Sequence, residues 1–170
     1  MIFSGEMATS AHYLFEEVWD IPGFDAQAVY SVISDAKLLP VWWRDVYLSS
    51  EPLDGDIPHE GARAKVHAKG FLPYTLKFTL TATRLEPNSL VETVAEGDFD
   101  GKWSAIISDY EGGTKVAITW DTEVKKPLIK WLSPILRPLF RWNHNWTTKK
   151  GEVGLRAYLQ MQRSNSGSVV

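Results

Sequence analysis

Hydrophobic and polar residues alternate through the middle of the chain, between residues 47 and 125. In YTLKFTLTA (74–82), aromatic and aliphatic residues alternate with threonine and lysine, which is typical of a strand with one buried face. Further strands are predicted at 47–50, 62–69, 90–99, 101–110 and 114–125. Short connections rich in Gly, Pro and Asn separate the later strands, so we predict an antiparallel sheet. The residues predicted to face inward are Tyr74, Leu76, Phe78, Leu80, Val91, Thr93, Ala95, Gly97, Trp103, Ala105, Ile107, Val116, Ile118, Trp120 and Val124.

Helical spacing appears at the two ends of this region. An opening strand at 13–21 is followed by a short helix capped by Asp25 and by a second short helical turn at 36–45. The segment 140–160 is predicted to form a long helix. At 100° per residue, its solvent-facing arc is narrow and consists of Arg141, Asn145, Lys149, Glu152, Arg156 and Arg163. We therefore expect a curved partner to enclose this helix.

The resulting order is a strand, two short helices, about six strands and a long terminal helix. Together with AVYSVISDAKLLPVWWRDV, EGDFDGKW, GGTKVAITWDTEV and RWNHNWTTKKGEVGLRAYL, it resembles the polyketide cyclase/dehydrase and lipid-transport group of the helix-grip superfamily (SRPBCC). START domains and the birch-pollen allergen type also belong there. The resemblance implies an α+β helix-grip fold, in which a curved antiparallel sheet of about seven strands wraps the C-terminal helix. It also implies an apolar cavity between sheet and helix.

Composition is consistent with one domain, which we expect to span 11–163, after an N-terminal extension at 1–10 and before a disordered tail at 164–170. The net charge of −3 argues against a nucleic-acid partner. No cysteine is present, the start does not resemble a signal peptide, and no apolar run is long enough to span a membrane. We therefore predict a cytoplasmic protein. The scattered His12, His59, His67 and His144 suggest no metal site, and we expect no cofactor.

Two glycines interrupt the predicted C-terminal helix, where each costs about 1 kcal/mol relative to alanine. Gly151 and Gly154 fall on its buried side. They either leave room for a ligand or admit a neighbouring backbone or aromatic ring. Asn143, Thr147 and Tyr158 lie near the same arc and could hydrogen-bond a ligand oxygen, although backbone or water could satisfy them equally. Lys150 either extends outward from the flank of the helix or meets an acidic ligand group.

Eight tryptophans are many for 170 residues. The resemblance places Trp42 and Trp43 at the cavity entrance, and we expect one of them to be exposed because neighbours on a helix diverge. Trp103 and Trp120 should point into the cavity, although an ordinary core role would explain them as well. The candidate ligand-binding residues are Trp42, Trp43, Tyr74, Phe78, Trp103, Trp120, Asn143, Thr147, Gly151, Gly154 and Tyr158.

Catalytic residues stay unassigned. We favour a structural role for His144, because no acidic or nucleophilic residue at readable spacing would orient it as a base. Glu96, Asp98 and Asp100 alternate onto one strand face, for which solvent is the default.

The segment 124–142 mixes apolar and basic residues with tryptophan, which suits a membrane surface, packing over the cavity mouth or packing against a second copy of the chain. Pro127, Pro134 and Pro138 predict that it is a broken connector and not one continuous helix.

Three functions remain open. The chain could bind or carry a hydrophobic small molecule, act as a polyketide cyclase or dehydratase, or transfer lipid at a membrane surface. Binding of a lipid- or polyketide-like molecule is the first choice.

Overall fold

The computed structural model describes residues 12–71, 73–124 and 127–167, with side chains described except at 124–137, 139 and 140. The elements are β1 (His12–Pro22), α1 (Ala26–Ile33), η1 (Ala36–Leu38), α2 (Leu39–Trp42), β2 (Tyr47–Pro52), β3 (Arg63–Lys69), β4 (Thr75–Glu86), β5 (Leu90–Gly97), β6 (Phe99–Tyr110), β7 (Gly113–Val124) and α3 (Pro127–Ser166). This order confirms the predicted helix-grip arrangement.

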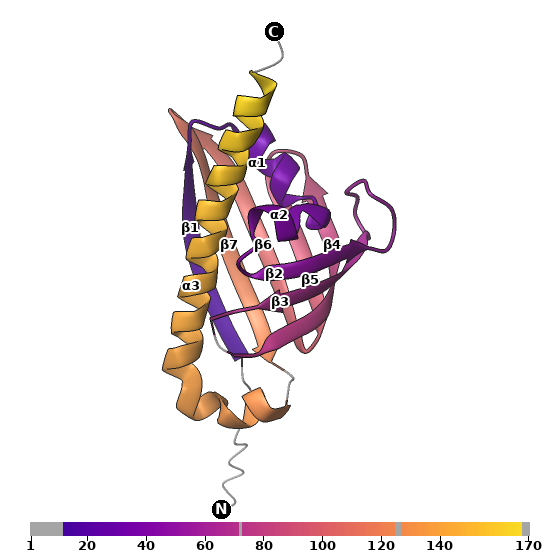
Figure 1. The fold of residues 1–170 in the computed structure, drawn as a ribbon, viewed down its shortest axis with the longest axis vertical. Coiled ribbons are helices and arrows are strands. Elements are labelled where there is room, and N and C mark those ends of the chain that lie inside the picture. The colour runs from indigo at the N-terminus through magenta and orange to yellow at the C-terminus, as the bar shows by residue number, and fades with distance from the viewer. Residues whose placement is uncertain (1–11, 72, 125–126, 168–170) are drawn as a thin grey trace, which may run out of the picture.

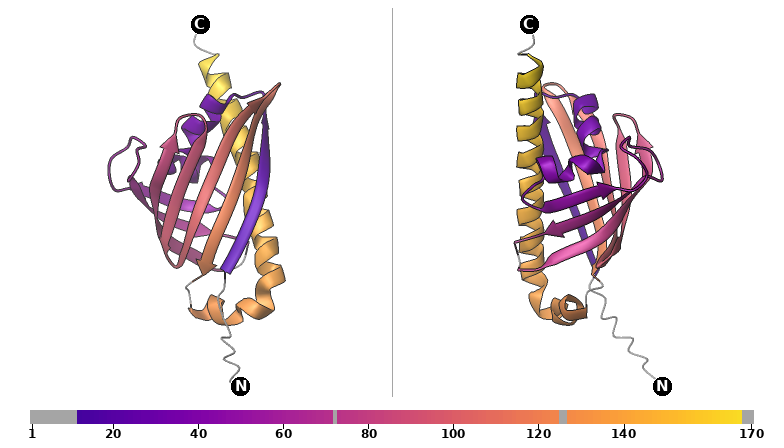
Figure 2. Two further views of the ribbon diagram at one scale, coloured as in Figure 1. Left: turned by 180° about the vertical axis from the view of Figure 1, so that it is seen from behind. Right: turned by 45° about the vertical axis from the view of Figure 1, so that its right-hand side comes forward.

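The strands form one antiparallel sheet of seven, in the order β1-β7-β6-β5-β4-β3-β2. The first strand therefore pairs with the last, in register from His12 opposite Glu123 to Pro22 opposite Gly113. The register shifts between Ala82 and Arg84 in β4, an irregularity of the kind that bends a strand. The sheet is strongly curved, with the short helices over its concave side and α3 along one flank beside β1 (Figures 1 and 2).

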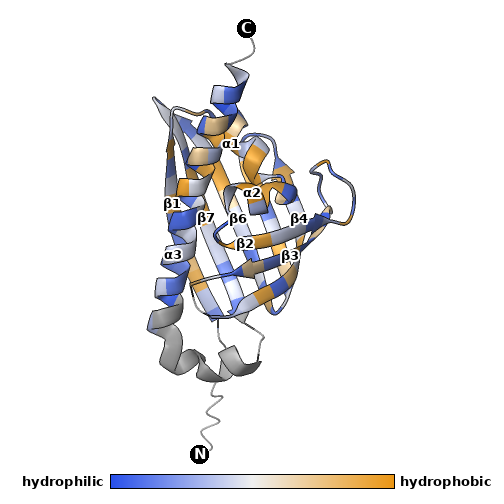
Figure 3. Ribbon diagram, in the orientation of Figure 1, coloured by the Kyte–Doolittle hydropathy of each residue, from blue (hydrophilic) through white to orange (hydrophobic). Residues whose placement is uncertain are grey.

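The core lies on the concave face, where the inward positions predicted from the alternation are mostly apolar (Figure 3). Val91, Ala105, Val116 and Ile118 are fully buried, as predicted. The prediction for Gly97 is wrong: it is exposed at the end of β5, with φ 151°, in the turn towards β6. Val124 lies outside the residues whose side chains are described.

The first short helix begins as predicted, because the Asp25 carboxylate accepts a hydrogen bond from the Ala28 N–H at 2.8 Å. The prediction that Trp42 or Trp43 is exposed is wrong, since both are buried. Helix α2 ends at Trp42, and Trp43 has a non-helical backbone with φ −116° and ψ 38°. The two side chains therefore no longer diverge as on a continuous helix, and their rings stack 5.1 Å apart.

Helix α3 is less enclosed than predicted. Trp142, Val153 and Met161 are about half exposed, because the helix lies along the β1 side of the sheet with one side facing outward. Two residues assigned to the solvent arc pack against β1 instead: the Glu152 carboxylate accepts from the Asp20 N–H at 3.1 Å, and Arg156 Nε donates to the Asp20 carbonyl at 2.7 Å.

The prediction of a broken connector before the terminal helix is also wrong. Helix α3 starts at Pro127, where a missing N–H costs nothing, and continues as a single helical element to Ser166. Its first part runs across the base of the sheet before the helix turns along the flank (Figure 1). A proline inside a helix can bend the helix without ending it. Among the described helices, none has both the length and the apolar character needed to cross a membrane.

Candidate functional site: two adjoining cavities

The first cavity lies between the concave face of the sheet, the short helices and the loop that joins β2 to β3. It holds about 1030 Å³ of space not filled by atoms, the open mouth included. The walls are chiefly apolar and aromatic side chains: Ile33, Leu39, Trp42, Trp43, Phe78, Leu80, Leu85, Val91, Phe99, Trp103 and Trp120. The resemblance implied a cavity between the sheet and the C-terminal helix. This cavity lies instead under α1, η1 and α2, with no α3 residue among its lining.

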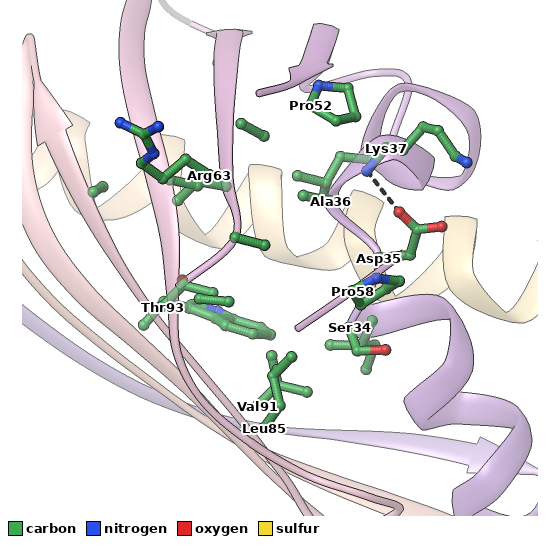
Figure 4. Close-up of a pocket in the computed structure, with 18 of the residues that line it drawn as sticks. Ser34, Asp35, Ala36, Lys37, Pro52, Pro58, Arg63, Leu85, Val91 and Thr93 are labelled. Atoms are coloured by element: carbon green, nitrogen blue, oxygen red, sulfur yellow. Dashed lines mark hydrogen bonds between the residues drawn. The ribbon is translucent and has the colours of Figure 1, made fainter. Parts of the chain in front are cut away.

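Charged groups gather at the mouth of the first cavity. Figure 4 shows the turn Ser34–Lys37 on one side, Arg63 of β3 across from it, and Val91 and Thr93 of β5 deeper in. Arg63 pairs with Asp54 at 2.9 Å, and the Lys37 ammonium lies 4.0 Å from the Asp56 carboxylate. Ion pairs this exposed contribute little stability.

The second cavity adjoins the first and is the one that α3 lines. It holds about 870 Å³, counted in the same way, and shares Trp43, Tyr47, Phe78, Phe99, Trp120 and Thr122 with the first. Its remaining walls include Tyr13 and Phe15 of β1, Tyr74 near the start of β4, and Asn143, His144 and Thr147 of α3. Burial raises the pKa of Tyr74 to about 12 and raises that of Tyr47 still further, so both phenols stay protonated near neutral pH.

Glu17 and His144 form a buried polar pair behind the second cavity. The Glu17 carboxylate lies 3.9 Å from His144 Nε2 and accepts a hydrogen bond from Trp120 Nε1 at 3.1 Å. The imidazole stacks on Phe15 at 3.8 Å between ring centroids and meets the edge of Trp120. Both side chains are less than one-fifth exposed.

Burial shifts both groups toward their neutral forms. It lowers the pKa of His144 to about 4. Burial raises the pKa of Glu17, partly opposed by hydrogen bonds from Thr148 and Trp120 to the carboxylate. His144 is therefore neutral at pH 7 and a weaker base than an exposed histidine.

Sequence reasoning missed Glu17 as a partner for His144, because the two lie 127 residues apart in the chain. A signal was nevertheless present in the opening strand. Its inward positions read Tyr13, Phe15, Glu17, Trp19 and Ile21, so a single carboxylate interrupts an otherwise aromatic and aliphatic face. A charged residue in a buried register needs a partner, which makes it a candidate for a site.

The structure brings most of the candidate ligand-binding residues together. Trp42 and Trp103 line the first cavity, Tyr74, Asn143 and Thr147 line the second, and Trp43, Phe78 and Trp120 line both. Tyr158 lines neither, because its ring packs against the core and its hydroxyl accepts a hydrogen bond from Gln162 Nε2 at 2.8 Å.

Gly151 and Gly154 line neither cavity, which corrects the prediction that they leave room for a ligand. A Cβ on Gly151 would lie 2.6 Å from the Trp43 ring and 2.7 Å from the Trp19 ring. A Cβ on Gly154 would lie 1.9 Å from the Trp42 carbonyl oxygen. Both glycines therefore serve close packing of α3 on the tryptophans and on the α2 backbone.

The other charged candidates lie on the surface. Lys150 Nζ sits 3.1 Å from the Asp45 carboxylate and 5.7 Å from the centre of the Trp146 ring, so its ammonium has partners within the protein. Glu96, Asp98 and Asp100 do not share one strand face, because Asp98 is in the turn between β5 and β6 and accepts from the Lys77 N–H. In the described part of the chain, no group of three or more His, Asp or Glu side chains is placed to hold a metal ion.

Comparison with known proteins agrees with this geometry. The family described as polyketide cyclase/dehydrase and lipid transport matches residues 23–153. The chain belongs to this family. No curated protein sequence matches the chain.

Several solved structures share the fold at low identity. The Zhui aromatase/cyclase from Streptomyces sp. R1128 superposes with a TM-score of 0.70 at 12% identity, covering 93% of this chain and 98% of that one. The di-domain aromatase/cyclase BexL gives 0.66 at 10% identity, covering 86% of this chain and 50% of that one. Ara h 8.0201 gives 0.59 at 13% identity, covering 88% and 99%. Such identities establish the fold alone.

Proposed function

We propose that this chain binds an apolar small molecule in the first cavity and serves as a binder or carrier. The observation that carries the proposal is the wall of this cavity, in which apolar strand residues from β4 to β7 meet Trp42 and Trp43 under the short helices. Burying a ligand against such a surface contributes roughly 25 cal/mol per Å² of apolar area. An apolar and aromatic lining with a few polar groups is typical of small-molecule sites.

Family membership supports the same function at a coarser level. The family name couples polyketide chemistry to lipid transport, and two structural neighbours carry the name aromatase/cyclase. Those activities belong to the neighbours, and the fold alone transfers to this chain. What this chain adds is the apolar lining, which suits a hydrophobic molecule of the lipid or polyketide kind.

The test is to fill the cavity from the sheet side. Ala95 is buried on β5 and lines the first cavity, so Ala95→Leu adds three carbons to its wall. We expect the variant to bind the neutral dye Nile red at least about tenfold more weakly, which corresponds to the loss of about 1.4 kcal/mol. Ala117→Leu is the matched control, because Ala117 is exposed on β7. Equal dye affinity in both variants would contradict the site, and native mass spectrometry of the purified protein would seek the natural ligand.

The pair of Glu17 and His144 favours a cyclase or dehydratase as the second candidate. A neutral imidazole at the wall of a cavity, with a carboxylate 3.9 Å behind it, has the parts of a general acid–base system. If a poly-β-ketone substrate is turned over, His144→Gln should lower the turnover number about a hundredfold while KM stays within about twofold. An unchanged turnover number would return His144 to a structural role.

Contact with a membrane surface through residues 124–142 stays a prediction, since most of those side chains lie outside the described ones. One feature supports it: Phe71 and Trp142 are about half exposed and their rings meet edge to face at 4.3 Å. Aromatic side chains of this kind anchor peripheral proteins at the interface. The expected result is sedimentation with vesicles containing phosphatidylserine at low salt, reduced in Trp142→Ala. No sedimentation with any vesicle would remove this function.

A further inference from the structure

The outward side of α3 carries an apolar stripe that no described strand or short helix covers. Val153, Ala157 and Met161 follow one another at intervals of four residues, which places them on one side of the helix. Val153 and Met161 are about half exposed and Ala157 is exposed, whereas Leu155 and Leu159 on the opposite side are buried. Figure 2 shows the sheet and the short helices on one side of α3 only. Contiguous exposed apolar residues mark a surface that contacts a partner.

The charged side of α3 is turned toward β1, which is why the apolar stripe faces outward. Glu152 and Arg156 both bond to the Asp20 backbone. One turn beyond, Arg163 Nη1 donates to the Gly23 carbonyl at 3.3 Å. These contacts fix the rotation of α3 about its own axis. The pattern of apolar and polar residues on this helix is therefore satisfied only when a further surface covers the stripe.

We propose that a second copy of the chain covers this stripe, with the two α3 helices packed antiparallel about a two-fold axis midway between Val153 and Ala157. Val153 of one copy then lies against Ala157 of the other, and the symmetry repeats this contact. Both side chains are small, so the helix axes can approach to about 8 to 10 Å. The inference goes beyond ligand binding and does not depend on it, because no α3 residue lines the first cavity.

The stripe is complementary to itself in the size of its side chains. The symmetry that pairs the two small residues brings Met161 of one copy within one helical turn of Trp146 of the other, and thioethers pack well against aromatic rings. Large side chains therefore meet at both ends of the contact, and small ones meet at its centre.

The flank of the stripe that faces β1 is complementary to itself in charge. Along the helix axis, Glu152 of one copy lies within about 3 Å of the level of Arg156 of the other, so opposite charges face each other twice. Lys149 and Arg163 of the two copies also come to similar levels, but the Arg163 guanidinium is turned toward the Gly23 carbonyl.

The extent of the stripe sets the strength of the contact. From Trp146 to Met161 it is about 22 Å long. One helix face of this length buries less than about 1,200 Å² in total, which is typical of weak and transient interfaces. We therefore expect a dissociation constant on the order of 10 to 100 µM. The chain is then monomeric at the low micromolar concentrations at which its unfolding would be measured.

Sedimentation equilibrium of the full chain, over concentrations on both sides of this constant, tests the dimer. Val153→Glu places a carboxylate at the centre of the contact and should raise the dissociation constant at least about tenfold. Val18→Glu is the matched control, because Val18 is 63% exposed on β1 and lies outside the stripe. Its dissociation constant should equal that of the wild type. Circular dichroism would show that both variants are folded.

A mixture of two variants tests the antiparallel arrangement. Ala157→Lys alone should weaken the dimer as Val153→Glu does. When the two variants are mixed, the introduced carboxylate faces the introduced ammonium, and the second contact keeps its original Val153 and Ala157. A heterodimer should therefore form at concentrations at which neither variant associates with itself. A parallel pair would instead place each introduced charge against the unsubstituted residue at the same position.

The inference is overturned if the wild-type chain is monomeric at about 500 µM, well above the expected constant. If that monomer sediments with phosphatidylcholine vesicles and Val153→Glu does not, the stripe contacts lipid and not a second copy. A dimer that Val153→Glu leaves intact, or a mixture that forms no heterodimer, would overturn it as well. None of these outcomes bears on Nile red binding in the first cavity, which tests the proposed function separately.

Discussion

The concave face of the sheet is used differently on its two sides. On the α3 side, the helix lies so close that Gly151 meets two tryptophan rings and Gly154 meets the Trp42 carbonyl oxygen. On the side of the short helices, the same sheet leaves an apolar cavity open to solvent at its rim. Glycine in a helix can signal a cavity, but here it marks the sealed side.

The tryptophans also differ in whether their indole N–H groups have a hydrogen-bond acceptor. Trp43 Nε1 donates to the Thr147 carbonyl of α3, and Trp120 Nε1 donates to the Glu17 carboxylate of β1. The indole nitrogens of Trp42 and Trp103, two rings that line only the first cavity, have no acceptor in the described part of the chain. The two acceptors come from α3 and from β1, the strand beside which α3 lies.

The strongest test of the sealed side is Gly154→Leu. Its Cβ would sit 1.9 Å from a backbone oxygen, which cannot move aside as a flexible side chain can. We expect the free energy of unfolding to fall by at least about 3 kcal/mol, which exceeds the gain of about 1 kcal/mol in helix propensity. Urea unfolding at pH 7 measures the change.

Ala157→Leu is the control for Gly154→Leu, because Ala157 is exposed on the same helix. It should change the free energy of unfolding by less than about 0.5 kcal/mol. If Gly154→Leu were as stable as the parent and bound Nile red more weakly, the glycine would after all face ligand space.

The alternation of apolar and polar residues predicted the sheet correctly because burial of one face fixes the register of every strand. In β7, Val116 and Ile118 are buried and Trp120 lines both cavities, as predicted. The same reasoning misjudged α3, because it predicts that a curved partner encloses the helix at 140–160. Periodicity gives the width of a polar arc but not the position of the partner, and α3 sits at the edge of the sheet beside β1.

The side chains that line the candidate site could be predicted from the sequence, but how they divide between the two cavities and α3 could not. The inward Phe78, Trp103 and Trp120 follow from strand period, and all three line the first cavity. The Trp43 side chain donates a hydrogen bond to α3, whereas Trp42 meets α3 through its backbone carbonyl. This difference depends on the chain leaving helical geometry at Trp43. No local pattern encodes that change of direction, nor the approach of Glu17 to His144 across the fold.

The second prediction concerns the pH dependence of stability through His144. Its pKa in the folded protein is about 4, below the 6.5 of the unfolded chain. The unfolded chain therefore takes up this proton first as the pH falls, and acidification from pH 6.5 to 4 should reduce stability by up to about 3 kcal/mol on account of this residue. Above pH 6.5 the contribution is constant. His144→Gln should abolish it, which urea unfolding at pH 7, 6, 5 and 4.5 would measure.

Other ionisable groups around the second cavity set the background for that experiment. Glu17 lies nearest, and Lys69, Tyr13 and Tyr74 line the same cavity. Burial raises the pKa of Glu17, so the folded protein takes up this proton before the unfolded chain does, which favours folding as the pH falls and opposes the effect of His144. The comparison with His144→Gln removes this shared background. Parallel stability curves for the two proteins, or a histidine that titrates above pH 6.5 by NMR, would contradict the prediction.

The smallest expected effect is a difference in the free energy of unfolding between Trp43→Phe and Trp42→Phe. Both variants weaken an edge contact with Trp19. Trp43→Phe also removes the hydrogen bond to the Thr147 carbonyl and weakens ring contacts with Tyr47 and Trp120, whereas Trp42→Phe removes a donor that has no partner in the described structure. Both lose a similar ring volume, so the hydrogen bond and the ring contacts account for the difference. We expect Trp43→Phe to be less stable than Trp42→Phe by at least about 1 kcal/mol, of which about half to all is the hydrogen bond. Urea unfolding of the two ligand-free variants gives the value. Should Trp42→Phe prove the less stable of the two, its N–H must be paired in the free protein, by water or a bound molecule, and the distinction between a sealed and an open side would lose its energetic basis.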